Sequence, residues 1–311
     1  MRSILSVAAL QLGYLHSDPK QSASLNAIAV DQTNQALITY RPAIEDITES
    51  NAPSLFATAT LTTVFAFRTA TVDLQEILTT IPAGVDTVPH ATAEQLTNSV
   101  ARTVWSVRSA LSVLSPGWQW VKRSELNALS TRDWWPEPEC RVPVNAKAMK
   151  EDSRLCAIQM MLASSSTLSV DDAQCLTSAL QELRQTYALV SQLTVPIAFV
   201  ASASNPSNTS TVNVLKDRAA IIAWAAKIPR QYVKLLECGN CEAMVIVAHW
   251  AILLARVCNV WWSGHLGASI IEAVAMVLGG DKWDLLRWPI EAAGVVVKME
   301  LRPGPTASHE M

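Results

Sequence analysis

"HWAILLARVCNVWWSGHLG", residues 249–267, is the stretch that most strongly constrains the fold. Its alanine, leucine, isoleucine and tryptophan residues predict a helix that is apolar on nearly every side, which is typical of a buried core helix. Four polar residues interrupt the pattern: His249, Arg256, Asn259 and Ser263. At 3.6 residues per turn these four fall near one face, so we expect that face to meet a polar group.

The composition outside this stretch is that of a large helical core. Half of the 311 residues are hydrophobic and only 16% are charged, which is enough apolar material for a sizeable interior. We therefore predict a single all-α domain over residues 1–311, a helical bundle or barrel with an apolar central cavity and loops at about 132–145 and 202–213. The predicted helices cover residues 2–15, 22–47, 52–69, 73–80, 91–114, 121–130, 146–164, 170–192, 212–227, 229–236, 240–262 and 264–278.

Charge and hydropathy exclude several partners. A net charge of −3 gives no concentrated basic face, so we expect no binding to nucleic acid. The longest uncharged apolar run, residues 243–255, is too short to span a bilayer, so we expect no membrane contact and a cytoplasmic location. Six cysteines in a chain of this length do not form a disulfide framework. The chain could form a homodimer.

The sequence around the opening stretch is similar to a known family. Residues 249–294 contain a leading histidine, the pair Trp261–Trp262, and a Trp288–Pro289 step before a glycine. The segments "AALQLGYL", "NQALITYRPAI", "ITESN" and "LFATATL" precede them in the family's order. The chain thus resembles the regulatory domain of fungal zinc-cluster transcription factors of the sterol uptake control type. This resemblance implies a helical barrel with an apolar ligand-binding interior.

The family's DNA-reading module has no counterpart in this sequence. That module places six closely spaced cysteines and basic residues at the N-terminus, whereas the first cysteine here is Cys140. We therefore expect no DNA-binding domain. A regulator without its DNA reader would not find promoters alone, and this favours an enzyme on the same fold.

Fungal humulene-type sesquiterpene cyclases with unorthodox sequences supply the analogy for such an enzyme. We predict a class I type cyclase that ionises a linear prenyl diphosphate, such as farnesyl diphosphate, and cyclises the carbocation. The diphosphate requires Mg²⁺ and a cationic side chain, and the carbocation requires aromatic faces in a dry pocket.

The opening stretch, residues 249–267, contains candidate residues for this chemistry. Asn259 and Ser263 are four apart, as in the first part of the Asn-x-x-x-Ser-x-x-x-Glu magnesium motif, but Gly267 occupies the third position. Arg256, one turn earlier, could bind a phosphate. Asp31 could supply a further carboxylate to the metal.

Large side chains nearby are candidates for the pocket wall. We expect Trp261 or Trp262, together with Leu285, to line or support it. A purely structural role for Arg256 remains open, in which it pairs with an acid such as Glu242 or Glu272.

The alternative function is a non-enzymatic regulator. It would bind a sterol-like or other apolar effector, or pair with a full-length transcription factor and titrate it. Residues 249–263 would then line an effector pocket. The incomplete magnesium motif favours this alternative, whereas the missing DNA reader favours the enzyme.

Overall fold

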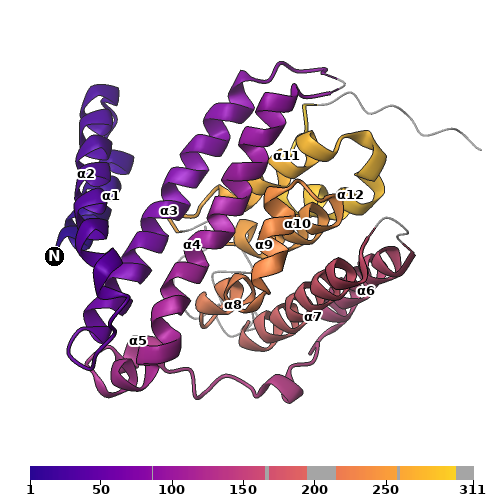
Figure 1. Cartoon of the computed structure of the whole chain (residues 1–311). Coiled ribbons are helices and arrows are strands. Elements are labelled where there is room, and N and C mark those ends of the chain that lie inside the picture. The colour runs from indigo at the N-terminus through magenta and orange to yellow at the C-terminus, as the bar shows by residue number, and fades with distance from the viewer. Residues whose placement is uncertain (86, 165–167, 195–214, 258–259, 299–311) are drawn as a thin grey trace, which may run out of the picture.

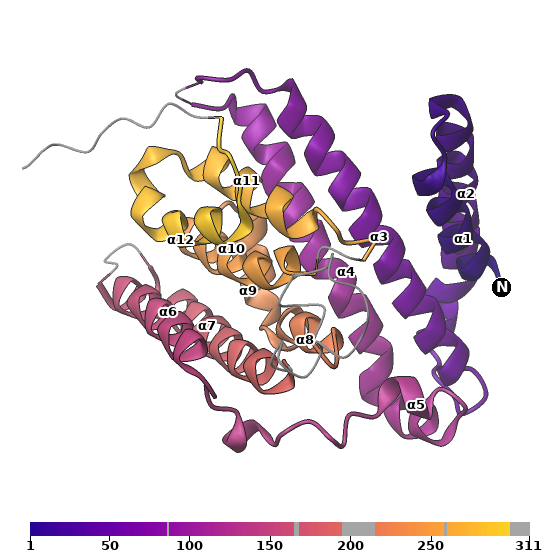
Figure 2. The same cartoon turned by 180° about the vertical axis from the view of Figure 1, so that it is seen from behind.

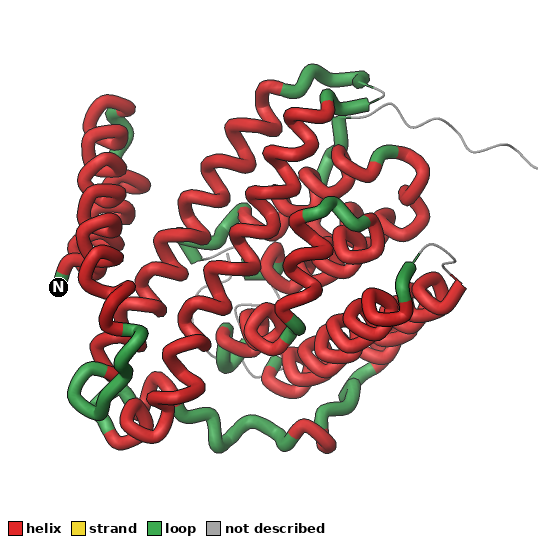
Figure 3. Tube along the Cα trace, in the orientation of Figure 1, coloured by secondary structure: helices red, strands yellow, loops and turns green. Residues whose placement is uncertain are grey.

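The computed structural model describes most of the chain. Outside loops and turns, the described residues are helical, and an isolated β-bridge joins Thr194 to Leu215. The predicted all-α class is confirmed (Figure 3). The predicted loop at 202–213 lies outside the described residues, whereas the loop at 132–145 is present and holds a short 3₁₀ turn. The described residues are 1–85, 87–164, 168–194, 215–257 and 260–298.

Twelve α-helices are present in the described part of the chain. The bounds are α1 Arg2–Leu15, α2 Pro19–Ala43, α3 Ala52–Thr80, α4 His90–Arg123, α5 Asn127–Ser130, α6 Ala146–Ser164, α7 Val170–Leu193, α8 Ala219–Lys227, α9 Arg230–Glu237, α10 Cys241–Ala255, α11 Leu266–Leu278 and α12 Trp283–Ala293.

The long helices α3 and α4 form an antiparallel pair that divides the molecule (Figures 1 and 2). The hairpin of α1 and α2 lies on one side of this pair, against α3. The helices α8 to α12 lie on the other side, and the antiparallel pair α6 and α7 packs beyond them. Residues on α2 are therefore separated from residues on α6 by the α3–α4 pair.

Helix α10 is the centre of the core. Every residue from Ala243 to Leu253 is buried, which fits a helix that is apolar on all sides. It contacts α7, α8, α9, α11 and α12. The only charged residue in the helix, Glu242, lies in its first turn, where a carboxylate interacts favourably with the helix dipole.

Several helix limits differ from the prediction. The predicted helices 52–69 and 73–80 are one helix, α3. The helix continues between them because Ala70 and Thr71 are buried against neighbouring helices. Helix α4 likewise continues through Pro116 to Arg123. Helix α12 was not predicted as a helix.

The opening stretch is not one continuous helix, and this corrects the predicted polar face. Helix α10 ends at Ala255, Arg256 is its C-cap, and residues 260–265 form turns before α11. A Cβ at Gly267 would lie 2.2 Å from the amide nitrogen of Ala255 and 2.4 Å from the carbonyl oxygen of Ala251. The chain therefore turns back so closely that α11 rests on the last turn of α10.

Helix α3 is long and apolar enough to cross a membrane by length and composition. A third of that apolar window, 33%, is buried inside the protein, where α3 packs along α4. Arg68 in its middle places a guanidinium 4.8 Å from the ring centroid of Tyr14. These contacts are compatible with a core helix of a soluble protein.

Replacement of Gly267 by alanine should disrupt the α10–α11 contact. The new methyl group would overlap backbone atoms that cannot move without shifting a helix, so we expect a loss of about 3 kcal/mol or more in the free energy of unfolding. Chemical denaturation followed by circular dichroism measures it. Gly280→Ala is the matched control, because a Cβ there meets nothing within 4 Å. Equal stability of the two variants would contradict the tight contact.

Candidate functional site

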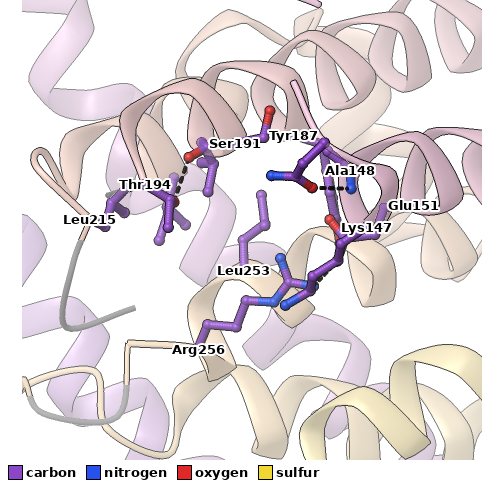
Figure 4. Close-up of a pocket in the computed structure, with 12 residues that line it drawn as sticks. Lys147, Ala148, Glu151, Tyr187, Ser191, Thr194, Leu215, Leu253 and Arg256 are labelled. Atoms are coloured by element: carbon purple, nitrogen blue, oxygen red, sulfur yellow. Dashed lines mark hydrogen bonds and ion pairs between the residues drawn. The ribbon is translucent and has the colours of Figure 1, made fainter. Parts of the chain in front are cut away.

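A small pocket lies between α6, α7 and the end of α10 (Figure 4). Its volume is about 70 Å³, room for a few water molecules. Common ligand pockets begin at roughly 300 Å³, so this pocket suits a small polar molecule rather than a prenyl chain. Its lining residues are Asn145, Lys147, Ala148, Glu151, Tyr187, Val190, Ser191, Thr194, Leu215, Ile221, Leu253 and Arg256.

An ion pair forms one wall of the pocket. Arg256 extends from the end of α10 toward α6, where its guanidinium pairs with the carboxylate of Glu151 (Figure 4). The two side chains are only 18% and 11% exposed. The guanidinium carbon also lies 5.8 Å from the ring centroid of Tyr187, a cation–π distance. The charge of Arg256 is thus compensated within the protein.

Tyr187 joins the pocket to the centre of the core. Its hydroxyl donates to the carbonyl oxygen of His249 over 2.7 Å. Burial raises the pKa of the Tyr187 phenol well above its ordinary value, so this group stays protonated and does not act as a base.

His249 is a buried, neutral histidine. Its Nδ1 donates to the carbonyl oxygen of Val245 over 2.8 Å, and its ring lies 5.3 Å from that of Trp288. Burial lowers the pKa of His249 to about 4, and the nearby charge of Arg154 acts in the same direction. Because its hydrogen bond is to its own helix, this side chain serves the core and faces no ligand.

The pocket hydroxyls are also engaged within their own helix. Ser191 donates to the carbonyl of Ala188 over 2.7 Å, and Thr194 donates to that of Val190 over 2.6 Å. Neither hydroxyl is hydrogen-bonded to a basic side chain, so neither is arranged as an activated nucleophile.

The structure describes two of the three predicted magnesium ligands, Asp31 and Ser263. Asp31 lies on the exposed face of α2 and accepts hydrogen bonds from Gln35, on the opposite side of the α3–α4 pair from Arg256 (Figure 1). Ser263 is buried in the turn before α11. Asn259 lies outside the described residues. The described part of the chain contains no group of three or more His, Cys, Asp or Glu side chains arranged for a metal. The Mg²⁺ site stays a prediction.

The predicted wall residues contact three different helices. The ring of Trp261 lies 6.1 Å from that of Tyr14 on α1, and the ring of Trp262 lies 5.7 Å from that of Phe67 on α3. Leu285 on α12 packs against the main core. None of the three belongs to the lining of the Arg256 pocket.

Glu151 was missed by the sequence analysis, although a signal for it exists. The buried residues of α6 follow a three–four spacing, and Glu151 occupies one place in that apolar stripe. A carboxylate on a buried stripe needs a cation as its partner. Arg256, the arginine of the apolar stretch 249–267, is such a cation. The stripe consists of Ala148, Glu151, Leu155, Ile158 and Leu162.

Comparisons with known proteins give a partial match. A segment of 77 residues, 24% of the chain, is 32% identical to a Zn(2)-C6 fungal-type transcription factor of Gibberella zeae. The chain covers 16% of that protein's length. No family description and no solved structure matches the chain. The similarity supports the resemblance to fungal transcription factors that was expected from the sequence.

The Arg256–Glu151 pair should carry a large coupling energy. Arg256→Met or Glu151→Leu alone leaves a mostly buried partner charge, and each should cost about 3 kcal/mol of unfolding free energy. The double variant should lose clearly less than the sum, with a coupling of about 2 kcal/mol in a double-mutant cycle. The exposed pair Arg287–Glu291 is the control and should couple much more weakly. Additive losses at the buried pair would contradict its structural role.

His249 should make the protein lose stability as the pH falls. The pKa of His249 is about 4 when folded and near 6.5 when unfolded, so below pH 6.5 the unfolded chain binds more protons. This residue should remove about 2 kcal/mol of unfolding free energy between pH 7.5 and pH 5. Urea denaturation at both pH values measures the loss. In His249→Gln this pH-dependent loss of about 2 kcal/mol should vanish. In His16→Gln, at an exposed site, the loss should persist. An unchanged pH dependence in His249→Gln would refute the assignment.

Proposed function

We propose that the chain is a non-enzymatic regulator of the fungal transcription-factor type, which acts by binding a protein partner. The observation that carries this proposal is the 32% identity over 77 residues to a Zn(2)-C6 fungal-type transcription factor. Because the chain covers 16% of that protein, the transcriptional role is an inference about this chain.

The surroundings of Arg256 support a regulator over a cyclase. A diphosphate-binding arginine needs its charge available to the ligand, whereas Arg256 is paired with Glu151 in a pocket of about 70 Å³. The cyclisation of a prenyl diphosphate stays a prediction, as do the absence of nucleic-acid binding and the cytoplasmic location.

A protein partner accounts for the described surface better than an apolar effector. The pocket at Arg256 is too small for a sterol-like molecule, and two larger pockets, of about 620 and 370 Å³, are lined largely by polar side chains. Large aliphatic side chains are instead exposed on α1 and α2, on the far side of α3 from the pocket at Arg256. Exposed apolar patches of this kind mark sites of protein contact.

A tethering experiment tests the regulator. The chain is fused to a heterologous DNA-binding module in a fungal host, and transcription from a reporter with the matching sites is measured. We expect a clear change in reporter transcription relative to the module alone. A Gly267→Ala fusion is the control, because disrupting the core should abolish the effect.

A second arm tests the enzyme directly. Purified chain is incubated with farnesyl diphosphate and Mg²⁺, and volatile products are analysed. We expect no product above the protein-free control. A cyclic product that depends on both protein and Mg²⁺, together with an inactive fusion, would overturn the proposed function in favour of the cyclase.

A further inference from the structure

Helix α1 turns its small residues inward. The hydroxyl of Ser6 donates to the carbonyl oxygen of Ala29 on α2 over 2.8 Å and lies 2.6 Å from the hydroxyl of Thr33. A Cβ at Gly13 would lie 2.8 Å from the side-chain oxygen of Asn26. The two helices of the hairpin therefore approach closely through small and polar side chains. Leu10 is a large side chain of α1 that is buried with them, and the other large aliphatic side chains lie elsewhere.

Those large side chains face outward. Ile4, Leu5, Leu12 and Leu15 are 56%, 49%, 52% and 67% exposed. They fall within about a quarter-turn of one another around the helix axis at 100° per residue. An amphipathic helix on the surface of a monomer normally has the reverse arrangement, with leucine inside and polar residues outside.

The spacing of the outward residues is that of a helix-packing seam. Leu5, Ala8, Leu12 and Leu15, the outer seam, are separated by three, four and three residues. This is the a/d pattern by which one helix packs into another. Between Arg2 and Asp18 the sequence has no aspartate, glutamate, lysine or arginine, so the outer seam carries no charge.

We propose that the outer seam is the interface of a homodimer, in which α1 of one protomer packs antiparallel to α1 of a second copy. A seam without charge is complementary to itself under a two-fold axis, whereas a seam built for a different partner commonly carries charges that select it. The two α1–α2 hairpins would then form a four-helix bundle. This proposal goes beyond the proposed function. It assigns the exposed face of α1 to a second copy of the chain, and the exposed aliphatic side chains of α2 remain for a different protein.

The outer face is large enough to supply a substantial part of a dimer interface. Its large residues expose on the order of 400 Å² of surface. This is about half of the roughly 800 Å² that each partner buries in a stable complex, and the polar side chains around the seam would supply the remainder. A helix bound to a lipid surface would in contrast have several lysines or arginines on its polar face, and α1 has Arg2 alone.

Sedimentation velocity across roughly 1–100 µM protein tests the dimer. We expect the wild type to sediment with the mass of two chains, and Leu5→Glu/Leu12→Glu to sediment as one chain, with the dissociation constant raised at least ~100-fold. Because both leucines are half exposed, the variant should keep its helicity and melting temperature. Met160→Glu/Val170→Glu is the matched control, since it places two glutamates at exposed aliphatic positions on α6 and α7 and should remain dimeric.

A cross-linking measurement keeps the test independent of the folding of that variant. In an antiparallel pairing of the outer seam, Ala8 of one protomer lies opposite Leu12 of the other. Mild oxidation of a mixture of Ala8→Cys and Leu12→Cys protomers should therefore link them to a far greater extent than in the wild type.

Three outcomes would overturn the proposal. The first is a wild type that stays monomeric at the highest concentration. The second is a dimer that survives Leu5→Glu/Leu12→Glu, because this places the interface elsewhere. The third is a monomeric wild type that co-sediments with phosphatidylcholine vesicles, because this assigns the outer seam to a lipid surface.

Discussion

The backbones of α10 and α11 touch at Gly267, where no side chain larger than hydrogen fits against Ala251 and Ala255. Helix α10 ends at this contact, and the first turn of α11 packs on its last turn. Arg256 is thereby delivered at a helix end, from which it reaches Glu151 on α6. The turn that follows sends Trp261 to α1 and Trp262 to α3. One steric constraint thus fixes the small pocket and also attaches the N-terminal hairpin.

The sequence predicted the central helix because its signal is local. Fifteen residues with a single charge at one end are apolar on all sides, and such a helix has to be buried. The end of that helix could not be predicted in the same way. The periodicity of Arg256, Asn259 and Ser263 was extended beyond Ala255 on the assumption that the helix continues, whereas a contact with a segment twelve residues later ends it.

The partner of Arg256 was unpredictable for a related reason. Glu151 is more than a hundred residues away in sequence, and two nearer acids, Glu242 and Glu272, were equally plausible on composition. What the sequence did contain was an acid on the buried stripe of α6 and an arginine in an apolar stretch. Each is costly alone, and only the tertiary fold shows that they compensate each other. The polar residues that first suggested a ligand thus bind groups of the protein itself. Arg256 pairs with Glu151, and His249 donates to the carbonyl oxygen of Val245.

The position of α10 has a consequence for how the protein is made. Its neighbours α7, α8 and α9 are synthesised before it, but α11 and α12 follow it and extend to Ala293. A nascent chain therefore carries this apolar helix without a complete cover until the residues up to Ala293 have been synthesised. Such a segment is a natural substrate for chaperones, and removal of α11 and α12 would expose the centre of the core rather than its edge.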